Sequence, residues 1–198
     1  MNRHATALAA ILALGALLIV AGCGGESSDS GASSQPQAVS FDQAFIDAMV
    51  PHHEQAIEMA TDARAAGLSE RPLAEIADAI IATQQQEIDE MKGWREDWFG
   101  SSTIDPDGAD TLGMSMEEMG MSSTRMDFST EHDVDAAFAS MMLDHHQGAI
   151  AMAGLALEKA EHGEVTDLAR AIIVAQQKEI GVLHTYAGSD HGMGDMGG

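Results

Sequence analysis

The sequence predicts an all-α protein, an antiparallel four-helix bundle built from two repeated helical hairpins. The 198 residues are 45% hydrophobic but only 4% aromatic. The core must therefore consist mainly of Ala, Ile, Leu and Met, which favour helices over strands. The same helical hairpin occurs twice in the chain, and its apolar residues follow a helical period.

Two blocks of the sequence recur with nearly constant spacing. Residues 42–60 and 135–153 are identical at 10 of 19 aligned positions, and residues 76–91 and 168–183 at 8 of 16. The offset between the copies changes from 93 to 92, so only the turn between the two blocks differs in length. Each copy is thus one helix–turn–helix unit, and two such units form a four-helix bundle.

The apolar residues of the first helix alternate at spacings of four and three, which places them on one helix face. Gly67 is expected to end the first helix and Gly163 the third. The face of the first helix comprises Phe45, Met49, His52, Ala56 and Met59. The expected boundaries are a bundle over 41–187, with repeats at 41–99 and 130–187 and a connection at 100–129.

The beginning of the chain has the composition of an export signal. Arg3 and His4 form a short basic start, Ala7 to Gly22 are apolar and uncharged, and the run ends in "VAGC". This ending resembles a bacterial lipoprotein signal, in which Cys23 would receive the lipid. We expect residues 1–22 to be a signal peptide and residues 23–40, rich in Ser and Gly, to be a flexible linker. The domain would then lie on the extracytoplasmic face of the cell membrane.

The charge of the chain excludes one class of partner. The formal net charge is −23. Binding to nucleic acid needs a basic surface, so a nucleic-acid partner is not expected. An acidic surface attracts cations, although it also serves solubility alone.

Two adjacent histidines occupy each repeat, in "MVPHHEQAIEMA" and "MMLDHHQGAIAMA". A polar side chain in a bundle core is costly unless it is paired. Hairpin geometry brings a Gln and a Glu of the second helix level with the first histidine of each pair, and methionines lie within a turn or two. The candidate metal ligands are His52, His53, His145, His146, Gln84, Glu87, Gln176, Glu179, Met49, Met91 and Met142.

The connection and the end of the chain contain further methionines. Both stretches are polar and rich in Gly, so we expect these side chains to be exposed rather than part of the core. Thioether and imidazole ligands together favour copper, in particular Cu(I). The residues concerned are Met114, Met116, Met119 and Met121 in the connection, and His191, Met193 and Met196 in the tail at 188–198.

The paired "HH" motifs, each followed by "QQxEI", resemble the bacterial "domain of unknown function 305" family. The resemblance covers residues 41–99 and 134–187. It implies a ferritin-like helical bundle that is often exported, and an association with copper binding and copper tolerance. The sequence thus predicts a lipid-anchored copper-binding protein for buffering, sequestration or delivery.

The sequence leaves two alternatives open. The histidines would form a structural hydrogen-bonded layer if the domain were a cell-surface interaction module without metal. A di-iron oxidase would need Glu-x-x-His at the repeated positions, which the sequence lacks. No catalytic motif is present, so an enzyme is not expected. A homo-oligomer and a copper-delivery partner are both compatible with the sequence, which identifies neither.

Overall fold

The fold is all-helical, as the sequence predicts, in a computed structural model that describes residues 39–125 and 127–188. These residues contain no β-strand, and none of their helices is long and apolar enough to cross a membrane. The elements are α1 (Phe41–Ala66), α2 (Arg71–Phe99), α3 (Gly108–Leu112), the 3-10 turn η1 (Phe128–Thr130), α4 (Val134–Lys159) and α5 (Gly163–Leu183).

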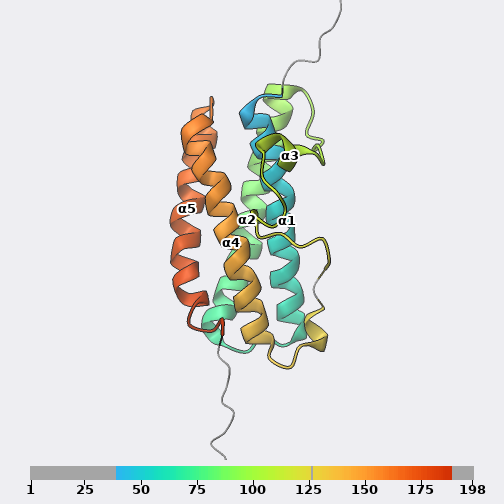
Figure 1. The fold of residues 1–198 in the computed structure, drawn as a ribbon, viewed down its shortest axis with the longest axis vertical. Coiled ribbons are helices and arrows are strands. Elements are labelled where there is room, and N and C mark those ends of the chain that lie inside the picture. Colours follow the sequence, from blue (N-terminus) through green and yellow to red (C-terminus); the bar gives the residue numbers. More distant parts are fainter. Residues whose placement is uncertain (1–38, 126, 189–198) are drawn as a thin grey trace, which may run out of the picture. The chain divides into compact units, whose positions relative to one another are not determined.

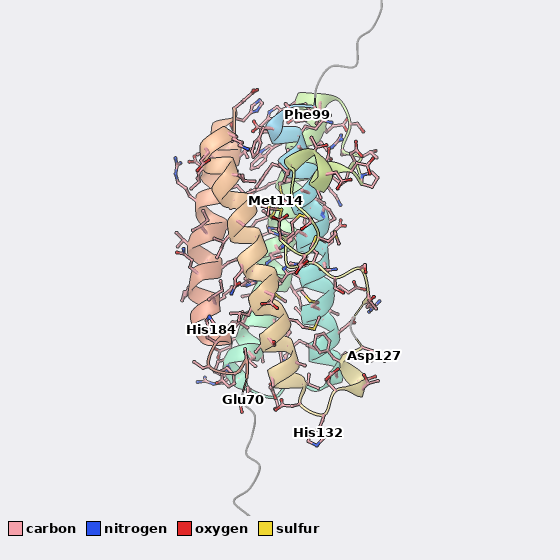
Figure 2. All side chains as sticks on the ribbon, in the orientation of Figure 1. Glu70, Phe99, Met114, Asp127, His132 and His184 are labelled. Atoms are coloured by element: carbon pink, nitrogen blue, oxygen red, sulfur yellow. The ribbon has the colours of Figure 1, made fainter. Side chains whose placement is uncertain are left out.

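The four long helices form two antiparallel hairpins, α1–α2 and α4–α5 (Figure 1). The hairpins meet mainly through α1 and α4, which pack side by side and run in opposite directions, whereas α2 and α5 touch far less. Figure 2 marks the two ends of the bundle, with Glu70 and His132 at one and Phe99 at the other. The middles of α1 and α4 therefore meet at the centre of the bundle.

The ends of the helices follow the local sequence, with one exception. The Ser40 side chain accepts a hydrogen bond from the Gln43 N–H at 3.2 Å and caps α1. Gly67 ends α1 with φ of 104°, a left-handed conformation that glycine adopts most readily. The expectation for Gly163 is wrong. The residue begins α5 instead, because α4 already ends at Lys159 and Ala160 has extended backbone angles.

Two aspartates at equivalent positions of the repeat tie the hairpins together. The buried Asp42 of α1 accepts hydrogen bonds from the N–H groups of Glu161 and His162, at 3.0 and 2.8 Å, just before α5 begins. Asp135 of α4 accepts from the N–H groups of Ser69 and Glu70, at 2.9 and 2.8 Å, just before α2 begins. Each hairpin thus supplies a carboxylate for the unpaired N–H groups of the other.

The long connection lies against α1 and α4 and is anchored by an ion pair that sequence analysis missed. The Arg95 guanidinium of α2 binds the buried carboxylate of Asp47 in α1 through two hydrogen bonds, at 2.5 and 3.1 Å. The same carboxylate accepts from the N–H of Asp105 at 3.0 Å. α3 then packs on α1, where a Cβ at Gly108 would lie 2.5 Å from that of Asp47. We call residues 113–125, which continue across α1 and α4, the strap.

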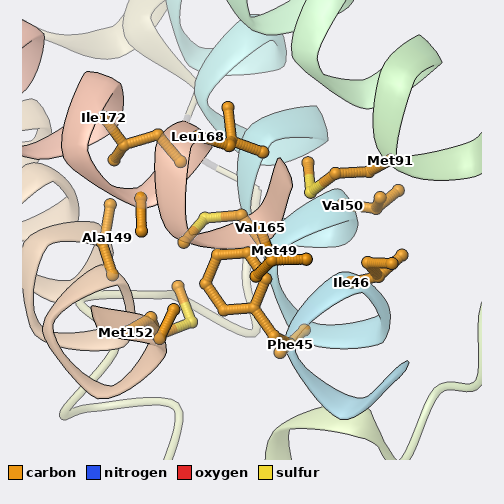
Figure 3. Close-up of a cluster of buried hydrophobic side chains, with 14 of the residues drawn as sticks. Phe45, Ile46, Met49, Val50, Met91, Ala149, Met152, Val165, Leu168 and Ile172 are labelled. Atoms are coloured by element: carbon orange, nitrogen blue, oxygen red, sulfur yellow. The ribbon is translucent and has the colours of Figure 1, made fainter. Parts of the chain in front are cut away.

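The hydrophobic core is divided into two clusters. One contains Phe45, Met49, Met91 and Met152, and Figure 3 shows side chains of α1, α2, α4 and α5 meeting there. The other lies toward the opposite end of the bundle and contains Phe138 and Met142, among others. The tandem histidines fall between the two clusters in both α1 and α4, so a polar layer interrupts the core at its middle.

The reciprocal aspartates should stabilise the fold unequally. Asp42→Ala should lower the free energy of unfolding by about 2–3 kcal/mol, because charge-assisted bonds to a buried carboxylate are lost and partly buried N–H groups are left unpaired. Asp135→Ala should lower it by about 1 kcal/mol, since its site is more exposed and resembles an ordinary helix cap. Urea unfolding at neutral pH measures both values.

Asp167→Ala provides a matched control for these variants. Asp167 is an exposed partner of Arg170 at 2.7 Å on a helix surface. A change within about 0.5 kcal/mol is expected there. Equal losses for Asp42→Ala and Asp167→Ala would show that the contacts between hairpins do not carry the stability assigned to them.

Candidate metal centre

Four imidazoles meet in the middle of the bundle. His52 and His53 of α1 and His145 and His146 of α4 are each at most 1% exposed. The rings of His52 and His145 are in contact in a tilted arrangement, with centroids 3.7 Å apart and planes inclined by 35°. Because α1 and α4 are antiparallel neighbours, the two copies of the motif face each other across the pseudo-symmetric centre.

The outer histidines are bound by the glutamates of the second helices. His53 Nε2 lies 2.8 Å from Glu87 Oε2, and His146 Nε2 lies 2.6 Å from Glu179 Oε2. A carboxylate accepts a hydrogen bond from the imidazole, so Nε2 carries the proton and Nδ1 keeps its lone pair when the ring is neutral. Both outer rings are thereby fixed as possible donors through Nδ1.

The sequence places a His, a Gln and a Glu at one level of the core in each half, with the first histidine of each pair as the reference. The glutamates bind the second histidine instead. The first histidines, His52 and His145, face the opposite hairpin and lie against each other with tilted rings. Successive helical residues differ in direction by about 100°, so only the second histidine of each pair faces its own hairpin partner.

Several buried polar atoms in this layer have no hydrogen-bond partner among the described residues. His145 has none at either ring nitrogen, and the other three histidines have none at Nδ1. Gln84 and Gln176, each 3% exposed, lack a partner at Oε1. Native proteins satisfy nearly all such groups, and each unpaired group costs about 1–3 kcal/mol. The atoms are those that an imidazole or amide presents to a metal ion, so the donor set fits one.

The central histidines are held neutral. Burial, as the largest cause, and then the neighbouring His53 together lower the pKa of His52 to about 3. Burial also lowers the pKa of His145 well below its usual range, as does the adjacent His52. Imidazole binds metal only in its neutral form. The environment therefore keeps both rings ready to donate a lone pair near neutral pH.

The methionines predicted beside the histidines lie above and below the layer. Met49 and Met91 belong to one core cluster and Met142 to the other, and all three are fully buried. Their packing alone accounts for their position. Within residues 39–125 and 127–188, no three His, Cys, Asp or Glu side chains are already arranged to hold a metal ion.

The strap closes one side of the histidine layer, and it corrects the expectation for the connection. Met119 is 1% exposed and belongs to the core, whereas the sequence predicts an exposed side chain. Its carbonyl oxygen lies 2.9 Å from His52 Nε2. A Cβ at Gly148 would lie 1.9 Å from this same oxygen, so only glycine lets the strap approach α4 so closely. In this position the strap both supplies a hydrogen-bond partner for His52 and buries the Met119 side chain in the core.

The other strap methionines differ in environment. Met114, labelled on the connection in Figure 2, and Met121 are half-buried against the core, while Met116 is 43% exposed. The predicted ligands of the tail and the predicted lipidation site lie outside the described residues. These are His191, Met193, Met196 and Cys23.

Comparison with known proteins identifies the family. The model described as "Domain of unknown function (DUF305)" matches residues 41–187. The chain belongs to the DUF305 family. No curated protein matches this DUF305 chain.

Solved structures support the same conclusion. The structure "CopM in the Cu(I)-bound form" is 32% identical, covers 73% of this chain and 94% of its own, and has a TM-score of 0.59. The Cu(II)-bound form of CopM has the same identity and coverage, with a TM-score of 0.60. A DUF305 protein from Streptomyces coelicolor is 27% identical over 73% of this chain and 90% of its own, with a TM-score of 0.65.

The buried histidines should make the metal-free protein sensitive to acid. The pKa of His52 is about 3 in the folded state and 6.5 in the unfolded chain, so the unfolded chain binds the extra proton between these values. Stability is thus fully present above about pH 6.5 and falls as the pH decreases. His145, whose pKa is also lowered, adds a loss of the same sign. Each ring contributes about 1.4 kcal/mol per pH unit to the slope.

Urea unfolding between pH 7 and 4.5 measures this slope. A His52→Gln, His145→Gln variant should have a flatter dependence than the wild-type protein. His132→Gln should not differ from wild type, because His132 is exposed. If the double variant and the wild-type protein have parallel curves, the two central rings are not held neutral by burial.

Proposed function

We propose that this DUF305 protein binds copper as cargo at its four central histidines, for buffering, sequestration or delivery. The observation that carries the proposal is the convergence of four buried imidazoles with ring nitrogens that lack partners. Such a layer is destabilising in itself, and a metal ion would compensate for it by binding these nitrogens. Copper would be cargo rather than a catalytic cofactor, since the sequence contains no catalytic motif.

The choice of copper rests on ligand chemistry and on similarity. Neutral imidazole binds copper in both oxidation states, and nearby thioethers favour Cu(I). CopM, which is 30–32% identical to this chain, has structures named as Cu(I)-bound, Cu(II)-bound and Ag-bound forms. Glu87 and Glu179 would orient the outer rings, so that each Nδ1 is directed away from its carboxylate. Since no three-ligand group is preformed in residues 39–125 and 127–188, binding would require the rings to rotate.

The hydrogen bonds from His53 and His146 to the two glutamates favour a second candidate function. In that case the layer would set the register of the helices, and the domain would be a cell-surface interaction module without metal. The register of α1 against α2 and of α4 against α5 would then depend on one imidazole–carboxylate pair each. Metal binding distinguishes the two functions directly.

A copper titration tests the proposal. Under anaerobic, reducing conditions the purified protein should bind Cu(I) tightly in competition with a chelator. A variant with all four central histidines changed to Gln should lose the tight site, because amides are poor ligands for Cu(I). Circular dichroism checks that the variant remains helical.

His132→Gln, His184→Gln is the matched control. Both residues are exposed, so this variant should retain the affinity and the stoichiometry of the wild-type protein. Full binding by the four-histidine variant would move the copper to other residues. The absence of tight binding in the wild-type protein would favour the structural layer.

We also propose that the protein is held on the extracytoplasmic face of the cell membrane by lipid on Cys23. The support is the sequence alone, since the "VAGC" run ends in Cys23, the single cysteine of the chain. The bundle would then bind copper outside the cytoplasm, at the end of a linker of about 20 residues.

Fractionation of bacterial cells that express the full chain tests the anchor. The wild-type protein should be found with membranes, and Cys23→Ser should move it to the soluble fraction or leave it with an uncleaved signal. Ser27→Ala is a control for a change in the linker. Equal partitioning of wild type and Cys23→Ser would argue against a lipid at this residue.

A further inference from the structure

A second group of methionines lines a cavity on the surface of the domain, apart from the histidine layer. The cavity has a volume of about 510 Å³ and opens between α1, α4 and the strap. Each of these three elements contributes one thioether, from Met59, Met141 and Met121 respectively. Met121 and Met141 are only partly buried, so their sulfur-bearing side chains face a space that solvent can enter.

Core packing accounts for part of this arrangement, because Met59 and Met141 belong to or pack against one core cluster and Met121 packs against the other. The repeat equivalents of these residues nevertheless differ from them. The repeat equivalent of Met141 is Ala48, and that of Met59 is Met152, which is fully enclosed. Met59 instead has 7% of its surface exposed and lines the cavity. The cavity is therefore specific to one side of the pseudo-symmetric bundle, the side on which the strap lies.

The charges around the cavity suit a cation. Asp144, Glu117 and Glu118 line it, and none of the residues that line it is basic. Arg125 lines an adjoining space that Met59 and Met141 also border, but it is held by Asp62 at 2.7 and 2.9 Å and by Glu58 at 2.8 Å. Thioethers bind soft, monovalent ions, whereas Mg²⁺ and Ca²⁺ require oxygen ligands.

We propose that Met59, Met121 and Met141 form a second, solvent-accessible site for a soft monovalent cation, Cu(I) or Ag(I). One thioether comes from each of three elements, so the site exists only when the strap is docked on the bundle. Asp144 and the two strap glutamates raise the local concentration of cations around it.

Gly120 of the strap brings the cavity close to the helix backbone that carries His145. Gly120 lines the cavity, and a Cβ at this residue would lie 2.1 Å from the Asp144 carbonyl oxygen and 2.9 Å from the His145 Cα. A metal ion bound by the three thioethers would thus lie next to the histidine layer. The site itself is independent of the histidines and does not rest on the proposed function.

The test uses the methionine methyl groups as reporters. The protein is labelled with ¹³C at the methionine methyl positions and titrated with Ag(I), which mimics Cu(I) and does not change oxidation state. The signals of Met59, Met121 and Met141, assigned through single Met→Leu variants, should shift together and reach saturation together. Met116, which is exposed and does not line the cavity, should not shift with this set. Mg²⁺ should leave all signals unchanged.

Two variants test the site independently of the central histidines. In the four-histidine variant the three methyl signals should respond as in wild type, which separates this site from the central one. In a Met59→Leu, Met121→Leu, Met141→Leu variant the number of bound Ag(I) ions should fall by one, while Met116→Leu should retain the wild-type number. Leu has nearly the volume of Met, and a thermal melt verifies the fold.

Separate saturation of the three methyl signals, or an unchanged Ag(I) stoichiometry in the triple variant, would overturn the proposal. Either result leaves the Cu(I) titration of the central histidines unaffected. Conversely, the loss of central copper binding would not move the three methyl signals.

Discussion

The constraint on which this structure depends is the burial of four imidazoles between two antiparallel helices. A neutral imidazole in an apolar core needs partners for its ring nitrogens. Glu87 and Glu179 provide one each for the outer rings, and the Met119 carbonyl provides one for His52. α2, α5 and the strap are therefore all held against α1 and α4 by polar contacts to this layer. The nitrogens that still lack a partner are the ones available to a metal ion.

The reciprocal aspartates and the histidine layer both connect the two hairpins through pairs of equivalent residues. Asp42 binds the residues just before α5 and Asp135 binds those just before α2, so hydrogen bonds join the hairpins at both ends of the bundle. The histidines join them at the centre. Few contacts join α2 and α5 directly. The hairpins are instead held together by contacts at both ends and at the centre of the bundle. Such a scaffold fixes the backbone around the histidines while their side chains keep unpaired atoms.

Much of the fold and of the histidine layer was predictable, because the residues that form them occur in both copies of the repeat. The identity of Asp42 and Asp135, of the histidine pairs, and of Glu87 and Glu179 indicates that these side chains perform equivalent roles. Which histidine meets the glutamate was not predictable from hairpin register, since it depends on how α1 faces α4. The burial of Met119 was also not predictable from the sequence, because the strap lies outside the repeat and has no second copy for comparison. A signal was nevertheless present in Gly148, a glycine in mid-helix that replaces Gln55 of the first copy.

The places where the two copies differ have a common physical cause. A two-fold bundle has two equivalent faces, but a single connection can cover only one of them in any given way. Gln55 binds the Ser122 backbone of the strap, whereas its equivalent Gly148 admits the Met119 backbone. Ala48 lies beneath Gly108, whereas its equivalent Met141 lines the cavity beside the strap. The differences between the repeats thus concentrate on the contacts of the connection, while the identical residues form the histidine layer. The strap, which contacts one side of that layer, is therefore where the two-fold symmetry of the bundle is lost.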